Sequence, residues 1–321
     1  MNINMNTNDF PQGPFLPLKL EIVIKYLQFF EYSFFILKPN QEFVEITVDK
    51  KTLKATMGNY QRRGLKEIYL KEEDYNDFSS NLRQHLEQKA SFKDALLDIE
   101  SLYSGLRQQF LSFGMSGITI RAAEEMNKMV IAQVTKSAGV AQLIVEFKDK
   151  FPEAFLTYIM LSYVSTSMID MFSWRSQQIK LKIGMASMLC NIELTQKDLE
   201  TINTSPQDQL PDSLRMYPIH TAANLQKNDP MIPAEVIQMI EMHRELPDAN
   251  GFPLHLRHTS IPLLPSIFIV AYNFIQELKK NDLDGTKISE ILNYIYASYN
   301  KGIFHQATLS LFSTFGSPIP A

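Results

Sequence analysis

The spacing of hydrophobic and polar residues changes along this chain. Across residues 16–78, short runs that alternate between apolar and polar residues are separated by turn sequences such as KPNQ and by Gly64. A period of two residues indicates strands with one buried face. The runs FFIL, EFVEITVD and LKEIYLK are therefore predicted strands, and a helix is expected near residues 52–63. We expect a small α+β domain over 16–78, after a flexible leader at 1–15.

A helical spacing begins near residue 76. Residues 76–113 contain no proline, and their apolar positions recur every three or four residues, which predicts one long amphipathic helix. Between the predicted domains at 16–78 and 116–321, this helix would be a linker that occupies residues 79–115. Its apolar face could pack against the chain's own domains or form the seam of a homodimer. The positions concerned are Phe92, Leu96, Ile99, Leu102, Leu106 and Phe110.

Strand signals nearly vanish after residue 116, and helical spacing dominates from there to residue 321. Segments such as AAEEMNKMVIAQV, QQIKLKIGMASML, LLPSIFIVAYNFIQELKK and KISEILNYIYASYN predict seven or eight helices in a compact all-α domain. The predicted fold class is therefore α+β, with a small N-terminal α+β domain followed by a helical bundle.

Composition narrows the classes of function. The 321 residues carry a net charge of −4, which gives no electrostatic reason to bind nucleic acid. The longest apolar runs reach only about ten residues where a bilayer span takes roughly 20, so no membrane segment is expected. A single cysteine, Cys190, excludes an internal disulfide and favours a reducing cytoplasm. The GxxxxGK[ST], GxGxxG, HExxH and GxSxG signatures are absent.

One segment carries a family resemblance. HRELPDANGFP (243–253) resembles HHExxDGxGYP, the signature of the HD-GYP family of cyclic-dinucleotide phosphodiesterases. Four further segments resemble other family motifs, and all five occur along the chain in the family's order. SMLCNIEL (187–194) resembles ALLHDIGK, YPIHTAANL (217–225) resembles HPxxGAxxL, IPLLPSIFIVAYNFI (261–275) resembles IPLxARIxAVADxFDA, and KGIFHQATLSLF (301–312) resembles GxxFDPxLVxxF. Together they cover most of residues 140–315 and identify the chain as similar to a degenerate HD-GYP domain of a bacterial signalling protein.

The resemblance implies a helical bundle that holds an iron-type metal centre, whose bound hydroxide attacks the phosphodiester. Most metal-ligand positions are replaced in this sequence. Only His243 is retained, and the replacements are Cys190 and Asn191 for the His-Asp pair, Tyr217, Arg244 and Tyr272. We therefore expect no metal, no cofactor and no catalytic residue. We also expect Cys190, Tyr217, His243, Arg244 and Tyr272 to converge on one pocket filled by side chains, with His243 bonded to a carbonyl or to Tyr217.

The residues that bind the dinucleotide substrate in the HD-GYP family are also replaced in this sequence. The family's lysine, tyrosine and arginine correspond to Leu194, Phe252 and Ser266, which makes cyclic di-GMP binding doubtful. Cys190, His220, His243 and Glu245 could form a new zinc site, but His220 lies three residues beyond the ligand position, which disfavours it. The alternatives to a non-catalytic HD-GYP-like module are an unconventional metal-dependent cyclic-dinucleotide phosphodiesterase and a non-enzymatic HDOD-type scaffold.

The DANGFP loop is a candidate for partner binding. Its chemistry is typical of a turn: Glu245 and Asp248 are expected to stabilise the helix end and the turn, Asn250-Gly251 to adopt positive φ, and Pro253 to fix the exit. By resemblance, the face around 248–253 could contact a protein partner such as a GGDEF-type diguanylate cyclase. Phe252 would either be exposed as an apolar anchor or fold inward to hold the loop.

Overall fold

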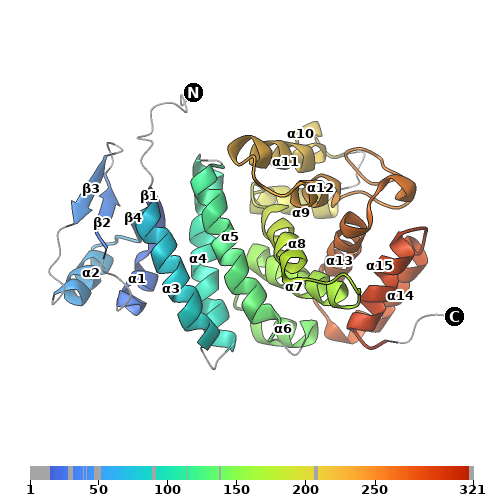
Figure 1. Ribbon diagram of the computed structural model, residues 1–321, viewed down its shortest axis with the longest axis horizontal. Helices are drawn as coiled ribbons and strands as arrows, with labels where there is room; N and C mark the ends of the chain where they lie inside the picture. Colours follow the sequence, from blue (N-terminus) through green and yellow to red (C-terminus); the bar gives the residue numbers. More distant parts are fainter. Residues whose placement is uncertain are drawn as a thin grey trace.

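A small antiparallel sheet forms the N-terminal end of the computed structural model (Figure 1), which describes residues 15–27, 32–38, 40, 42–46, 52–88, 92–113, 115–136, 139–205 and 209–317. The strand order is β1-β4-β2-β3. The strands are β1 (Phe15–Lys19), β2 (Phe34–Leu37), β3 (Phe43–Ile46) and β4 (Glu67–Lys71), and helices α1 (Leu20–Lys25) and α2 (Leu53–Arg62) connect them. Apart from Phe15, which begins β1, the predicted leader lies outside the described residues.

The inner face of this sheet follows the predicted alternation. Leu16 pairs with Leu70 and Leu18 pairs with Ile68, and all four side chains are buried. Every second residue therefore faces the core, as the period of a strand requires. Each of the three predicted strand runs contains one observed strand, and the helix predicted near 52–63 is α2.

The prediction of one long helix between residues 76 and 113 is wrong. Two helices, α3 (Glu72–Gln88) and α4 (Phe92–Phe113), run in opposite directions beside α5 (Figure 1). The sequence between them, Lys-Ala-Ser, contains no proline or glycine to signal a turn, and residues 89–91 lie outside the described part. Leu96, Ile99 and Phe110 of α4 are buried inside the chain, where α4 packs against β1, α5 and α7. The apolar face thus packs internally, and it is not exposed as a dimer seam.

The helical region holds eleven α-helices within the described residues, more than the seven or eight predicted. They are α5 (Gly117–Val134), α6 (Val140–Phe147), α7 (Glu153–Asp170), α8 (Gln177–Leu189), α9 (Gln196–Thr204), α10 (Asp212–Arg215), α11 (Tyr217–Asn228), α12 (Ala234–Met242), α13 (Leu263–Lys280), α14 (Ile288–Tyr299) and α15 (Phe304–Thr314). Helices α9, α10 and α11 were not predicted, because the first two are short and polar and the third was interpreted only as a motif.

Two long helices, α7 and α13, form the centre of the bundle. They pack against each other and are flanked by α5, α8, α12, α14 and α15. Buried apolar side chains form one continuous cluster from Leu16 in the sheet to Phe312 in α15. The predicted α+β fold class with a helical bundle is confirmed. Among the described helices, none combines the length and apolar character needed to cross a bilayer.

Candidate functional site

Six sequence-predicted positions come together around the C-terminal end of α12. Helix α12 packs against α8, α11 and α13, and so collects residues from three neighbouring elements. Two of the residues directly follow α8, one begins α11, two directly follow α12, and one lies within α13. In that order they are Cys190, Asn191, Tyr217, His243, Arg244 and Tyr272.

The hydroxyl of Tyr217 is the centre of this group. Its oxygen lies 2.6 Å from Nε2 of His243 and 3.0 Å from Oδ1 of Asn191. It also accepts a hydrogen bond from Nε of Arg244 at 2.9 Å. Asn191 extends the network, because its Nδ2 donates to the Tyr272 hydroxyl at 3.3 Å. Burial raises the pKa of Tyr217 well above its usual value, so the phenol remains protonated and neutral.

His243 is fully buried, and both of its ring nitrogens are engaged. Nδ1 lies 2.6 Å from the carbonyl oxygen of Ile240, which can only accept, so Nδ1 carries the proton and donates it. Burial, followed by the positive charge of Arg244, lowers the pKa of His243 to about 3. The ring is therefore neutral at physiological pH, and its Nε2 accepts from the Tyr217 hydroxyl. His243 has the two partners considered for it, a carbonyl and Tyr217, and no lone pair remains for a metal.

Arg244 places a positive charge in the same group without a carboxylate partner among the described residues. Its guanidinium carbon lies 4.7 Å from the ring centroid of Tyr272, 5.9 Å from that of Tyr217 and 6.0 Å from that of Phe252. Such distances are those of cation–π contacts, which stabilise a partly desolvated guanidinium. One of its nitrogens, Nη2, is buried without a hydrogen-bond partner in the described structure. The three aromatic faces and the Tyr217 hydroxyl are therefore the groups that face this charge within the described residues.

These residues do not fit the metal centre that the HD-GYP resemblance implies. Within the described part of the chain, no group of three or more His, Cys, Asp or Glu side chains is placed to hold a metal ion. Burial raises the pKa of Cys190 to about 12, which keeps the thiol protonated, whereas a metal binds the thiolate. A divalent cation ~4 Å from the guanidinium of Arg244 would be repelled by about 8 kcal/mol at an effective dielectric constant of ~20.

The zinc alternative has no geometric basis in the described residues. His220 is exposed on α11, whereas His243 is buried and has both nitrogens engaged. The carboxylate of Glu245 is also fully used, since Oε1 accepts from Leu254 N–H at 2.6 Å and Oε2 accepts from Leu256 N–H at 2.8 Å. Glu245 therefore holds the backbone of the following loop.

The start of the DANGFP loop has the predicted turn chemistry, with one correction. Oδ1 of Asp248 accepts from the backbone N–H of Asn250 at 3.1 Å, and Oδ2 accepts from its side-chain amide at 2.9 Å. The residue with positive φ is Ala249, at 66°, and the prediction of positive φ at Asn250-Gly251 is wrong. Gly251 is needed for another reason: a Cβ there would overlap the backbone of Glu245 and Leu246.

Phe252 folds inward, so its proposed role as an exposed anchor is wrong. Its ring is 7% exposed and packs in a small apolar cluster with Leu194, Leu199, Ile202, Leu210 and Tyr217. The loop instead exposes Leu254, which is 46% accessible and follows Pro253. Sequence analysis missed Leu254 because nothing in the DANGFPL pattern distinguishes which of two nearby apolar residues faces solvent.

Comparison with known proteins supports the fold. No protein-family model matches the sequence, and no curated protein matches it. One solved structure with a similar fold is Bd1817, an HDG"Y"P protein from Bdellovibrio bacteriovorus. It is 12% identical to this chain, with a TM-score of 0.57, and the match covers 94% of this chain and 100% of that chain. The chain therefore has an HD-GYP-like fold across nearly its whole length.

The burial of His243 predicts a pH dependence of stability. The pKa of this histidine is about 3 when folded and near 6.5 when unfolded, so between these values the unfolded state binds one more proton. The contribution of His243 to stability is therefore present above pH 6.5 and is lost as the pH falls toward 3, by up to about 1.4 kcal/mol per pH unit.

Urea unfolding of wild type and His243→Gln between pH 7.5 and 4 measures this effect, with exposed His220→Gln as the matched control. The stability advantage of wild type over His243→Gln should shrink as the pH falls. An advantage that stays constant over this range would contradict a neutral, buried His243.

Proposed function

We propose that this chain is a non-catalytic, HD-GYP-like signalling module that acts through protein partners. The observation that supports this most strongly is the network around Tyr217. In it, the positions of the family's metal ligands hold a neutral phenol, a neutral imidazole and an unpaired guanidinium. The phenol partners both the imidazole and Nε of the guanidinium, and the three groups offer no set of anionic ligands. A phosphodiesterase of this family needs a metal-bound hydroxide, and this donor set gives no means to generate one.

The HD-GYP-like fold also supports the proposal, because the structure around the site is well defined. The helices that position the site are all formed, and Glu245, Gly251 and the ring of Phe252 still hold the DANGFP loop in a defined shape. A scaffold that keeps its shape without the residues for chemistry is suited to recognition. The predicted link to cyclic di-GMP pathways follows from the family resemblance alone.

Metal content and hydrolysis test the absence of catalysis. Protein purified without chelators, and protein refolded with Fe²⁺ or Mn²⁺ under anaerobic conditions, should contain substoichiometric metal by elemental analysis and should not hydrolyse cyclic di-GMP. The expected reason is the repulsion and the missing ligands described above. Stoichiometric metal together with turnover would favour an unconventional phosphodiesterase and reject this proposal.

The partner surface that we propose is the outer side of the loop after α12. Here Asp248, Asn250 and Arg257 are exposed in the same segment as Leu254, so this segment offers one apolar residue and several polar ones. A GGDEF-type diguanylate cyclase is the proposed partner class, on the basis of the family resemblance. The loop backbone is fixed from inside by the carboxylate of Glu245, so substitutions at Leu254 leave its shape intact.

Titration of a purified GGDEF-domain protein from the same genome tests this surface. Leu254→Arg should weaken binding by about tenfold or more, because truncating a central apolar contact commonly costs more than 1 kcal/mol. Met231→Arg, which alters another exposed apolar residue outside the loop, is the control and should bind like wild type. Equal affinities for wild type and Leu254→Arg, or no wild-type binding, would remove this loop as the partner site.

A further inference from the structure

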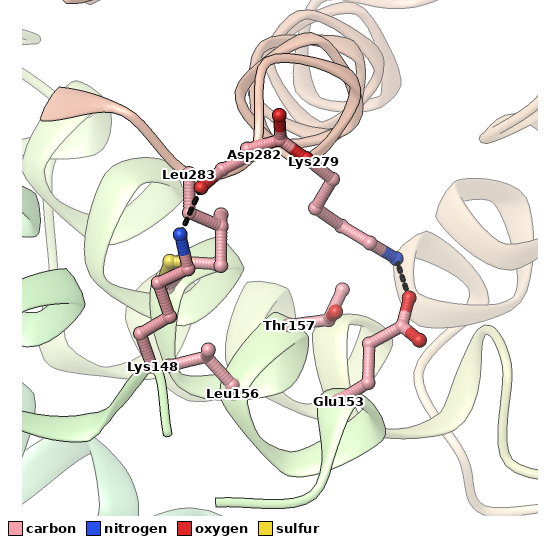
Figure 2. A pocket seen from close by; sticks show the side chains of 8 residues that line it. Lys148, Glu153, Leu156, Thr157, Lys279, Asp282 and Leu283 are labelled. Carbon is pink, nitrogen blue, oxygen red and sulfur yellow. Dashed lines mark hydrogen bonds and ion pairs between the residues drawn. The ribbon is translucent and has the colours of Figure 1, made fainter. Parts of the chain in front are cut away.

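The cavity in Figure 2 selects no class of ligand. It lies where the end of α13 meets α6 and α7, has a volume of about 300 Å³, and is lined by two lysines and two acidic residues, so its formal charges balance. Lys279 is already paired with Glu153, and Lys148 donates to the backbone carbonyl of Asp282. A more specific feature lies on the exposed surface, at the turn between α7 and α8.

This turn displays apolar side chains to solvent. Helix α7 ends at Asp170, α8 begins at Gln177, and the two helices pack against each other (Figure 1). Met171 is 49% exposed, and Trp174, the only tryptophan of the chain, is 39% exposed. The ring of Trp174 stacks on that of Phe172 with 4.7 Å between centroids, and Phe172 is itself packed against the core. Met171, Phe172 and Trp174 therefore form a fixed apolar patch, the turn patch.

The residue types in this segment are those of a protein interface. Tryptophan, phenylalanine, methionine and arginine are enriched at such interfaces, and tryptophan and arginine are the commonest binding hot spots. All four types occur within Met171–Arg175, and residues 173–178 are exposed without interruption. A tryptophan that only filled the core would not need to lie at the solvent-facing end of a helix pair.

Charges of both signs flank the turn patch. The side chain of Arg175 is exposed and forms no ion pair or hydrogen bond with any described residue. Asp170 pairs with Lys180 at 2.7 Å through Oδ2, but its side chain is still 41% exposed. The helix ends repeat this polarity, because the carbonyl end of α7 is partly negative and the amide end of α8 is partly positive. The patch thus has a negative side at Asp170 and a positive side at Arg175.

We propose that the turn patch binds the same patch on a second copy of this chain. A two-fold axis makes each patch its own partner, so such a surface must carry both members of every charge pair. Arg175 of each copy then meets Asp170 of the other, and Trp174 of one packs on Met171 of the other. A turn covers less than the ~800 Å² per partner of a standard interface, so the dimer is weak and concentration-dependent. It requires neither a metal nor a partner at the DANGFP loop, and is therefore independent of the proposed function.

Analytical ultracentrifugation of the purified chain from about 1 to 500 µM, the range of a small interface, tests the proposal. The average mass of wild type should rise from monomer toward dimer, and the fluorescence of Trp174 should shift to the blue over the same range. Trp174→Ser and Met171→Ser should each weaken association about tenfold or more. Met231→Ser, which alters an exposed residue outside the turn, is the control. A wild type that stays monomeric, or association that both turn variants leave unchanged, would overturn the proposal.

Charge exchange tests the pairing of Arg175 with Asp170 across the two-fold axis. Arg175→Asp alone would place carboxylates opposite each other, and Asp170→Arg alone would place guanidinium groups opposite each other, so each variant should associate more weakly than wild type. An equimolar mixture of the two should recover association, because opposite charges then meet in the mixed dimer. Circular dichroism checks that both variants are folded. A mixture that associates no better than its separate components would contradict the proposed two-fold contact.

Discussion

The hydroxyl oxygen of Tyr217 is the atom on which the arrangement of the site depends. It joins the end of α8 through Asn191, the end of α12 through His243 and Arg244, and the start of α11 through its own backbone. A buried polar group is expensive unless it is satisfied, and here the phenol partners both His243 Nε2 and Arg244 Nε. Loss of this one hydroxyl would leave His243 Nε2 and Arg244 Nε buried without their partner.

We propose that the same network holds an HD-GYP-like scaffold together without a metal centre. In the family that the sequence resembles, a cation at this position holds several helices together. Here a guanidinium provides the positive charge, three aromatic rings surround it, and a neutral histidine fills the space between Tyr217 and Tyr272. A positive charge is thus present within the Tyr217 network, and we propose that the open coordination positions of a metal centre are not. This combination is the physical basis for proposing a recognition role.

Much of the fold could be predicted because periodicity reports burial directly. The run FFIL is strand β2, and the segments predicted for α8 and α13 coincide with those helices. The break between α3 and α4 could not be predicted, because both helices present apolar residues at one continuous spacing and the turn carries no proline or glycine. At the site, a family resemblance identified which residues meet. It could not show that Phe252 turns inward or that Ala249 takes the positive φ, because both depend on how the loop packs against α9 and on Glu245.

A double-mutant cycle between Tyr217→Phe and Arg244→Met tests the central claim most directly. The free energies of urea unfolding of wild type, both single variants and the double variant give the coupling between the phenol and the guanidinium. If the two groups act as one buried unit in place of a metal centre, the coupling energy should be about 1–3 kcal/mol. Effects that add to within ~0.5 kcal/mol would contradict the account, because independent residues could not serve as the polar centre of the bundle.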